Sequence, residues 1–92
     1  MVTFNGKSLE LFNKYEIIVK QSDTRYKAIG TLESSFDYGG ARFNVEESDY
    51  PNGSWDGKGF YIKSSGEFMQ EPTTEEPNRY NKVGEVKEIN VV

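Results

Sequence analysis

The sequence predicts a small, mainly β protein: a single domain, residues 1–92, folded as an antiparallel sheet or barrel of five to six short strands. Three observations predict this fold class. Apolar and polar side chains alternate along several short runs, with the two-residue period of a half-buried strand. Residues typical of turns, above all Gly, Asn, Asp and Pro, separate those runs. Six Phe, six Tyr and one Trp supply large rings for the core of a 92-residue chain.

The first segment, residues 8–14, is compatible with two structures. Ser8 is suited to cap one short helical turn that places Leu9 and Phe12 inward. Leu9 and Leu11 equally fit the start of a strand. The fold class therefore leaves room for one short helix here.

The next two runs predict an antiparallel hairpin. Tyr15, Ile17 and Val19 share one face of residues 15–20, and the returning run, residues 25–32, alternates in the same way. Between them, residues 21–24 have the composition of a turn.

The middle of the chain predicts three further strands. Phe43 and Val45 point inward from residues 42–47, while the charged neighbours point outward. Residues 60–63 and 67–70 form a second short hairpin around a tight turn. Polar loops are predicted at residues 48–58 and 71–81, where Pro, Gly and carboxylates interrupt the pattern.

Residues 83–92 predict a last strand, because β-branched residues dominate them. The spacing of Val83, Val86 and Ile89 also fits one face of a helix, so both structures remain open. Closing the strands into a barrel would hide edges that so small a protein can scarcely cover otherwise.

The sequence argues against an enzyme. Histidine and cysteine are both absent, which removes the commonest general base, the commonest metal ligand and the most reactive nucleophile. A calcium loop starting at Asp49 fails, because its third position is Pro51 and its sixth is Ser54 instead of Gly. We therefore expect no catalytic residue, no metal and no cofactor.

Charge is the feature that indicates a function. Residues 33–76 carry ten carboxylates against three cations, within a chain whose net charge is −4. The carboxylates are Glu33, Asp37, Glu46, Glu47, Asp49, Asp56, Glu67, Glu71, Glu75 and Glu76. Such a balance argues against nonspecific binding to nucleic acid or anionic lipid and favours a cationic partner.

The loop 48–58 holds the single tryptophan, Trp55, among glycines. The ring either anchors the loop to the core or contacts a partner as an exposed hot spot. Tyr50, in the same loop, has the same two alternatives.

Regularly spaced carboxylates can imitate the phosphates of a nucleic acid. Glu47 and Asp49 are two residues apart, which on a strand puts them on one face about 6.6–6.8 Å apart, with Glu46 facing the other way. Glu67, and then Glu71, Glu75 and Glu76, are expected to extend the row. Such a surface binds the basic cleft of a DNA-binding protein by the counterion release that DNA itself uses.

In size, acidity, lack of cysteine and Lys/Glu/Asn/Tyr-rich composition, the chain resembles small acidic proteins that bacteriophages make during host takeover. The resemblance implies an inhibitor that acts by DNA mimicry on a basic, nucleic-acid-binding host protein. The absence of a basic start followed by an apolar stretch, and of any long apolar run, predicts a cytoplasmic location and no membrane contact. We expect a monomer or homodimer that binds no DNA itself.

The predicted partner-binding residues are Glu46, Glu47, Asp49, Tyr50, Trp55, Asp56, Glu67, Glu71, Glu75 and Glu76. Two alternatives remain. A small barrel could bind single-stranded nucleic acid, with Tyr26 and Tyr61 as stacking platforms and Arg25, Lys27 and Lys63 as phosphate contacts. The second alternative hypothesis is an accessory subunit that binds its partner through a charge-neutral interface.

Overall fold

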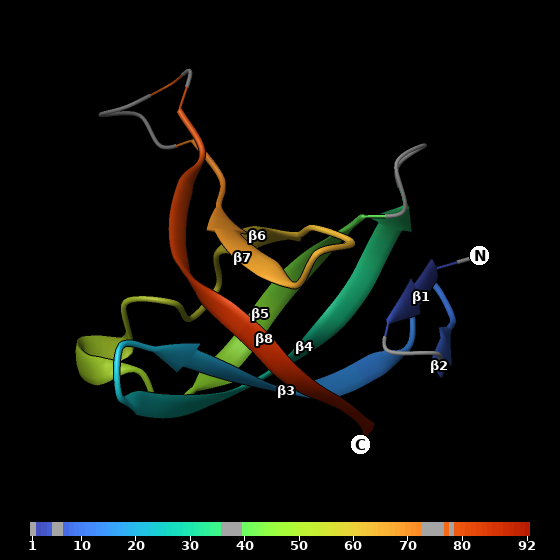
Figure 1. Ribbon diagram of the computed structural model, residues 1–92, viewed down its shortest axis with the longest axis horizontal. Coiled ribbons are helices and arrows are strands. Elements are labelled where there is room, and N and C mark those ends of the chain that lie inside the picture. Colours follow the sequence, from blue (N-terminus) through green and yellow to red (C-terminus); the bar gives the residue numbers. More distant parts are fainter. Residues whose placement is uncertain (1, 5–6, 36–39, 73–76, 78) are drawn as a thin grey trace.

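The computed structural model describes residues 2–4, 7–35, 40–72, 77 and 79–92, and it confirms the mainly β fold class (Figure 1). In these residues the strands are β1 (Val2–Phe4), β2 (Lys7–Leu9), β3 (Lys14–Gln21), β4 (Thr24–Ser35), β5 (Ala41–Ser48), β6 (Gly59–Ile62), β7 (Glu67–Gln70) and β8 (Asn81–Val91), with one 3₁₀ turn, η1 (Pro51–Gly53). The described residues contain no α-helix, so the helical alternatives for residues 8–14 and 83–92 are wrong.

Six of these strands close into an antiparallel barrel in the order β3-β4-β5-β6-β7-β8, with β8 returning to pair with β3. Each strand pairs with its neighbours in sequence, so turns or loops are enough to connect them. Closure leaves no unpaired edge among the six strands, which is how small β proteins avoid edge-to-edge aggregation.

A β-bulge explains the misleading spacing in β8. Ile18 lies opposite Glu88, whereas the next residue of β3, Val19, lies opposite Val86, so Lys87 is an extra residue. The bulge interrupts the two-residue period, and Val86 and Ile89 therefore both face the core although they are three apart.

A second bulge bends β5 against β4. Ile29 lies opposite Glu47 and Gly30 opposite Val45, so Glu46 is the extra residue here. Gly30 is needed at this point because a Cβ there would collide with the backbone carbonyl of Asn44.

The short hairpin β1-β2 lies beside the barrel near its C-terminal end (Figure 1). It is attached by its apolar side chains, because Phe4 and Leu9 are buried in the same cluster as the barrel interior. Phe4 reaches the turn between β6 and β7, where its ring passes within van der Waals distance of the position that a Cβ of Gly66 would occupy.

Aromatic side chains fill the barrel. Phe43, Phe60 and Phe68 are fully buried, and the rings of Phe60 and Phe68 stack with centroids 4.5 Å apart. An eight-stranded barrel is just wide enough to be filled by side chains. A six-stranded barrel is narrower, so its interior is a packed core and any binding must use the outer wall.

Candidate functional site

Trp55 anchors the loop 48–58 to the core. Its side chain is only 2% exposed, and its ring stacks on that of Tyr50 at 4.1 Å with an interplanar angle of 7°. The backbone beyond it returns to β5, with hydrogen bonds from Val45 N to Lys58 O and from Gly57 N to Val45 O, both 2.9 Å. Of the two alternatives for Trp55, the core anchor is confirmed, so this ring is not an exposed partner contact.

The side chain of Tyr50 also packs largely within the protein. One face of its ring is covered by Trp55, Tyr26 packs edge-on with centroids 4.7 Å apart, and its hydroxyl donates to Gln21 Oε1 at 3.2 Å. Its half-buried side chain fixes the loop and offers a partner little apolar surface.

The bulge in β5 places Glu46 and Glu47 on the exposed side of the strand, which corrects the expectation that Glu46 faces the other way. Glu46 joins three strands: Lys14 Nζ of β3 lies 2.9 Å from Glu46 Oε2, and Thr31 Oγ1 of β4 donates to Glu46 Oε1 at 3.1 Å. The hydrogen bond from Lys14 lowers the pKa of Glu46. Desolvation opposes this shift, and the hydrogen bond from Thr31 adds a smaller effect in the same direction as Lys14.

Asp49 and Asp56 hold the loop at the end of β5. Asp49 Oδ1 accepts a hydrogen bond from Lys27 N at 2.8 Å, and Ser48 Oγ donates to Asp56 Oδ1 at 3.0 Å. Both carboxylates are exposed, as is Glu47, and within the described chain none of the three has a cation at ion-pair distance. Glu47 and Asp49 line one shallow hollow of about 230 Å³.

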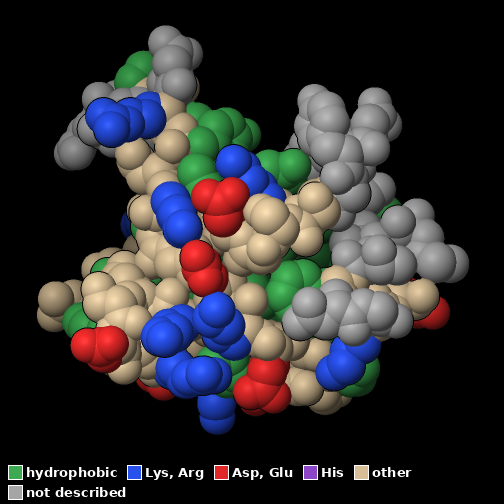
Figure 2. All heavy atoms as spheres, viewed as in Figure 1, with side chains coloured by type: hydrophobic (Ala, Val, Ile, Leu, Met, Phe, Trp, Pro, Cys, Tyr) green, Lys and Arg blue, Asp and Glu red, His purple; other side chains and the backbone are tan. Residues whose placement is uncertain are grey.

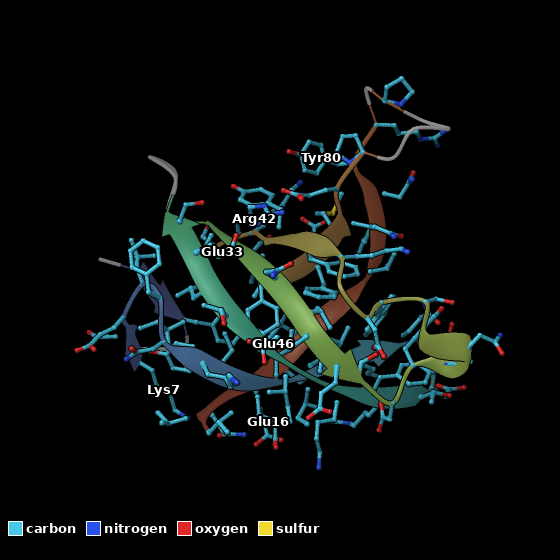
Figure 3. The ribbon with its side chains drawn as sticks, turned by 180° about the vertical axis from the view of Figure 1, so that it is seen from behind. Lys7, Glu16, Glu33, Arg42, Glu46 and Tyr80 are labelled. Atoms are coloured by element: carbon cyan, nitrogen blue, oxygen red, sulfur yellow. The ribbon has the colours of Figure 1, made fainter. Side chains whose placement is uncertain are left out.

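The other described carboxylates of the segment 33–76 lie elsewhere and are paired with cations. Glu71 forms a two-pronged ion pair with Arg42, with 2.8 Å between Oε2 and Nε and 2.9 Å between Oε1 and Nη2. Glu33 contacts the third nitrogen of the same guanidinium, and Figure 3 shows Glu33 and Arg42 side by side, away from Glu46. The hydrogen bonds that Arg42 donates to Glu71 raise the pKa of Arg42, although burial works in the opposite direction.

Glu67 lies on β7 between two lysines, with Lys63 Nζ at 3.7 Å and Lys82 Nζ at 3.9 Å. Glu75, Glu76 and Asp37 fall outside the described residues. The expected continuous row is therefore not formed by the described carboxylates, because the barrel carries β4–β5, β6 and β7 around to different sides. Four of them remain together, and we call Glu46, Glu47, Asp49 and Asp56 the acidic edge.

The stacking platforms of the single-strand hypothesis are not both available. Tyr26 packs inward against Tyr50 and Trp55. Tyr61 is half-buried on the outer wall and meets Tyr80 edge-on at 6.3 Å. Single-strand binding uses several aromatic rings on which successive bases stack, and one outer pair of rings does not supply such a series.

Sequence reasoning named Arg25 as a cation that could contact phosphate, but it missed that the cations of β3, β4 and β8 lie close together. Lys20 lies opposite Arg25 across β3 and β4, and Lys82 and Lys87 project from β8. The signal was present as lysines and arginines at the polar positions of alternating strands, but the adjacency of β3 and β8 is set by barrel closure and is not visible in the sequence.

Neither the family models, nor the curated proteins, nor the solved structures contain a match to this chain. Within the described ranges, no helix is long and apolar enough to cross a membrane, and no three Asp, Glu, His or Cys side chains are grouped as a metal site.

Proposed function

We propose that this protein is a non-enzymatic binding protein whose acidic edge occupies the basic, nucleic-acid-binding surface of another protein. The proposal includes the bacterial cytoplasm as its place of action, on the resemblance to phage takeover proteins. It also includes a monomeric or homodimeric state.

The observation that supports the proposal is the preorganised acidic edge. Glu47, Asp49 and Asp56 are exposed and lack ion-pair partners among the described residues, although other carboxylates of the same segment are paired. Hydrogen bonds and the buried Trp55 fix the backbone that carries them. A fixed group of unpaired carboxylates loses little conformational entropy when a cationic surface docks on it.

The filled interior supports the same proposal. Buried apolar and aromatic side chains fill the barrel, and the hollows of about 420, 230 and 290 Å³ that described residues line are open ones on its outer wall. Steering between opposite charges would speed association and make it sensitive to salt.

Capture from nuclease-treated bacterial lysate tests the proposal. We expect the immobilised protein to retain a nucleic-acid-binding protein at low ionic strength and to release it with added salt or duplex DNA. The variant Glu47→Gln/Asp49→Asn/Asp56→Asn should lose this capture, because it removes three charges while each amide oxygen can still accept a hydrogen bond.

The matched control is Glu10→Gln/Asp23→Asn/Glu88→Gln. It removes three exposed charges that likewise have no ion-pair partner in the described chain, and none of them belongs to the acidic edge. If both variants lose capture equally, the capture depends on net charge and not on the acidic edge. Capture that ignores salt, or that DNA does not compete with, would contradict mimicry and point to an accessory subunit.

A further inference from the structure

A hollow of about 420 Å³ lies on the outer wall where β3 and β8 separate. Lys20, Gln21 and Ser22 form one side, and Lys82, Gly84 and Lys87 are among the residues of the other side. We call it the β3–β8 groove. It is separate from the acidic edge, and Figure 2 shows Lys and Arg side chains gathered where β3 and β8 cross.

The groove exists because β8 changes partner. Its last pair with β3 joins Glu85 to Lys20, and from Gly84 towards its start β8 pairs with β7 instead. Glycine is needed at the crossing, since a Cβ on residue 84 would lie 2.7 Å from the carbonyl oxygen of Lys20.

The side chain of Gln21 fixes the two walls. Its Nε2 donates to the carbonyl oxygen of Val83 at 2.8 Å, while its Oε1 accepts from the hydroxyl of Tyr50. The groove is therefore a built feature with defined walls, and no rearrangement is needed to open it.

The position of Lys20 next to Arg25 lowers the stability of the free protein. Lys20 lies directly opposite Arg25, and like charges in opposed positions destabilise a sheet. Neither has a carboxylate at ion-pair distance in the part of the chain that the structure describes.

The same barrel relieves a like-charge pair elsewhere. Glu67 lies opposite Glu85 across β7 and β8, and Lys82 bridges them, with its Nζ 3.9 Å from Glu67 and 3.3 Å from Glu85. Glu85 is further engaged by Lys87 at 3.1 Å. Lys20 lies between Arg25 on β4 and Glu85 on β8, but in the described chain no carboxylate bridges Lys20 and Arg25 at ion-pair distance, which leaves a place for an anion.

The charge balance selects the anion. Three lysines of the lining, Lys20, Lys82 and Lys87, stand against one carboxylate, Glu85, so two positive charges remain. A phosphate monoester carries about −1.5 to −2 at neutral pH and offers three acceptor oxygens. A single carboxylate would leave one charge unmatched.

We propose that the β3–β8 groove binds a phosphate group, with Lys20 and Lys87 of its lining as donors and with Arg25, which lies opposite Lys20 on β4 and outside the lining, as a further donor beside it. Binding supplies the negative charge that the opposed cations lack, and it uses charge-assisted hydrogen bonds, which are stronger than neutral ones. Two sources share this chemistry: a free phosphate ester and the backbone of a nucleic-acid strand.

Amide chemical shifts of the ¹⁵N-labelled protein test the proposal in three titrations, with pyrophosphate, adenosine monophosphate and a thymidine oligonucleotide without terminal phosphates. We expect saturable shifts confined to residues 20–25 and 82–87. Saturation by pyrophosphate and adenosine monophosphate would identify a free phosphate ester as the ligand. Saturation by the oligonucleotide alone would identify the backbone of a nucleic-acid strand as the ligand. Sodium chloride at matched ionic strength should not produce the pattern.

Lys20→Gln/Arg25→Gln should weaken binding by about tenfold or more, because two charge-assisted hydrogen bonds are lost. The matched control is Lys58→Gln/Arg79→Gln, two exposed cations that also lack a described carboxylate partner but lie outside the groove. Pyrophosphate should raise the melting temperature of the wild type and not of the groove variant. Shifts spread over all lysines, or equal weakening in the control, would overturn the proposal.

Discussion

The ring of Trp55 is held from several sides. Tyr50 stacks on one face at 4.1 Å, and the rings of Phe60 and Phe68 meet it edge-on with centroids 5.5 and 5.4 Å away. Aromatic pairs in these geometries contribute about 0.5–1.5 kcal/mol each beyond the area they bury. The single tryptophan therefore joins the loop 48–58 to β6 and β7 and so positions the acidic edge.

Trp55→Ala should lower the free energy of unfolding by about 3–5 kcal/mol, the usual cost of truncating a buried large ring. Trp55→Phe should cost less, since a ring remains to pack on Phe60 and Phe68. Urea denaturation followed by circular dichroism measures both without the lost fluorophore. Tyr80→Ala is the control, because Tyr80 is 51% exposed. Equal losses in Trp55→Ala and Tyr80→Ala would show that Trp55 is not a core residue in solution.

The ion-pair partners of Arg42 could not be predicted from its residue type. It was counted as one cation within an acidic segment, but the structure makes it the centre of two ion pairs, with Glu33 and Glu71. Gly59 makes room for the guanidinium and for Glu71, since a Cβ there would collide with both. The sequence separation of 29 residues between Arg42 and Glu71 leaves no local signal for this contact.

At the scale of elements, alternation was sufficient to predict the strands of the barrel. The pattern around Ile17 and Phe43 is strict, because one side of each strand faces the core throughout. Bulges were not predictable, since they are set by the register with the neighbouring strand. The bulge at Lys87 produced a spacing that resembles a helix, and the bulge at Glu46 changed the face of a candidate site residue.

The hairpin β1-β2 was missed although the sequence carries its signal. Asn5-Gly6 is the dipeptide most typical of a two-residue hairpin turn, and it separates the runs that become β1 and β2. The competing pattern was the possible helix cap at Ser8. A run of three residues is too short for periodicity to decide between them.

The contact between Glu46 and Lys14 predicts a measurable titration. Because the folded-state pKa of Glu46 is lowered, mainly by the hydrogen bond from Lys14, its contribution to stability is present above the ordinary glutamate pKa and is lost as the pH falls through the lowered value. Carboxyl ¹³C shifts of Lys14→Met should show the pKa of Glu46 rising towards its ordinary value. Thr31→Val should give a smaller rise.

The control for this titration is Lys87→Met. Lys87 is the main cause of the lowered pKa of Glu85, with Lys82 second, so this variant should shift Glu85 and leave Glu46 unchanged. An unchanged pKa of Glu46 in Lys14→Met would mean that the three-strand contact does not persist in solution.

For the whole molecule, linear clustering of charge is a poor guide to surface charge. The segment 33–76 has an excess of seven carboxylates in sequence, yet the packing of neighbouring strands pairs Glu46 with Lys14 of β3 and Glu67 with Lys82 of β8. Closure of the barrel by β3 and β8 collects cations of these two strands at one groove. A protein of net charge −4 therefore presents a positive region and an acidic edge on different parts of its wall.

The hairpin β1-β2 should open independently of the barrel. Among the described strands, β1 and β2 pair with each other through three residue pairs, and the hairpin is attached to the barrel by the buried Phe4 and Leu9 and by a hydrogen bond from Lys7 Nζ to Ile89 O. The barrel strands, by contrast, are bonded on both sides. Native-state hydrogen exchange should therefore give β1-β2 amides a lower opening free energy than those of β3 and β4, whose values should approach the global free energy of unfolding.

Two variants make this prediction specific. Leu9→Ala should lower the opening free energy of β1-β2 amides, because about 2–4 kcal/mol of burial is lost from the contact that holds the hairpin. Val91→Ala, at a position that is 83% exposed at the end of β8, should leave it unchanged. If the hairpin amides instead exchange only with global unfolding, then β1-β2 belongs to the same cooperative unit as the barrel. The buried side chains of Phe4 and Leu9 would in that case be as essential to closure as the pairing of β3 with β8.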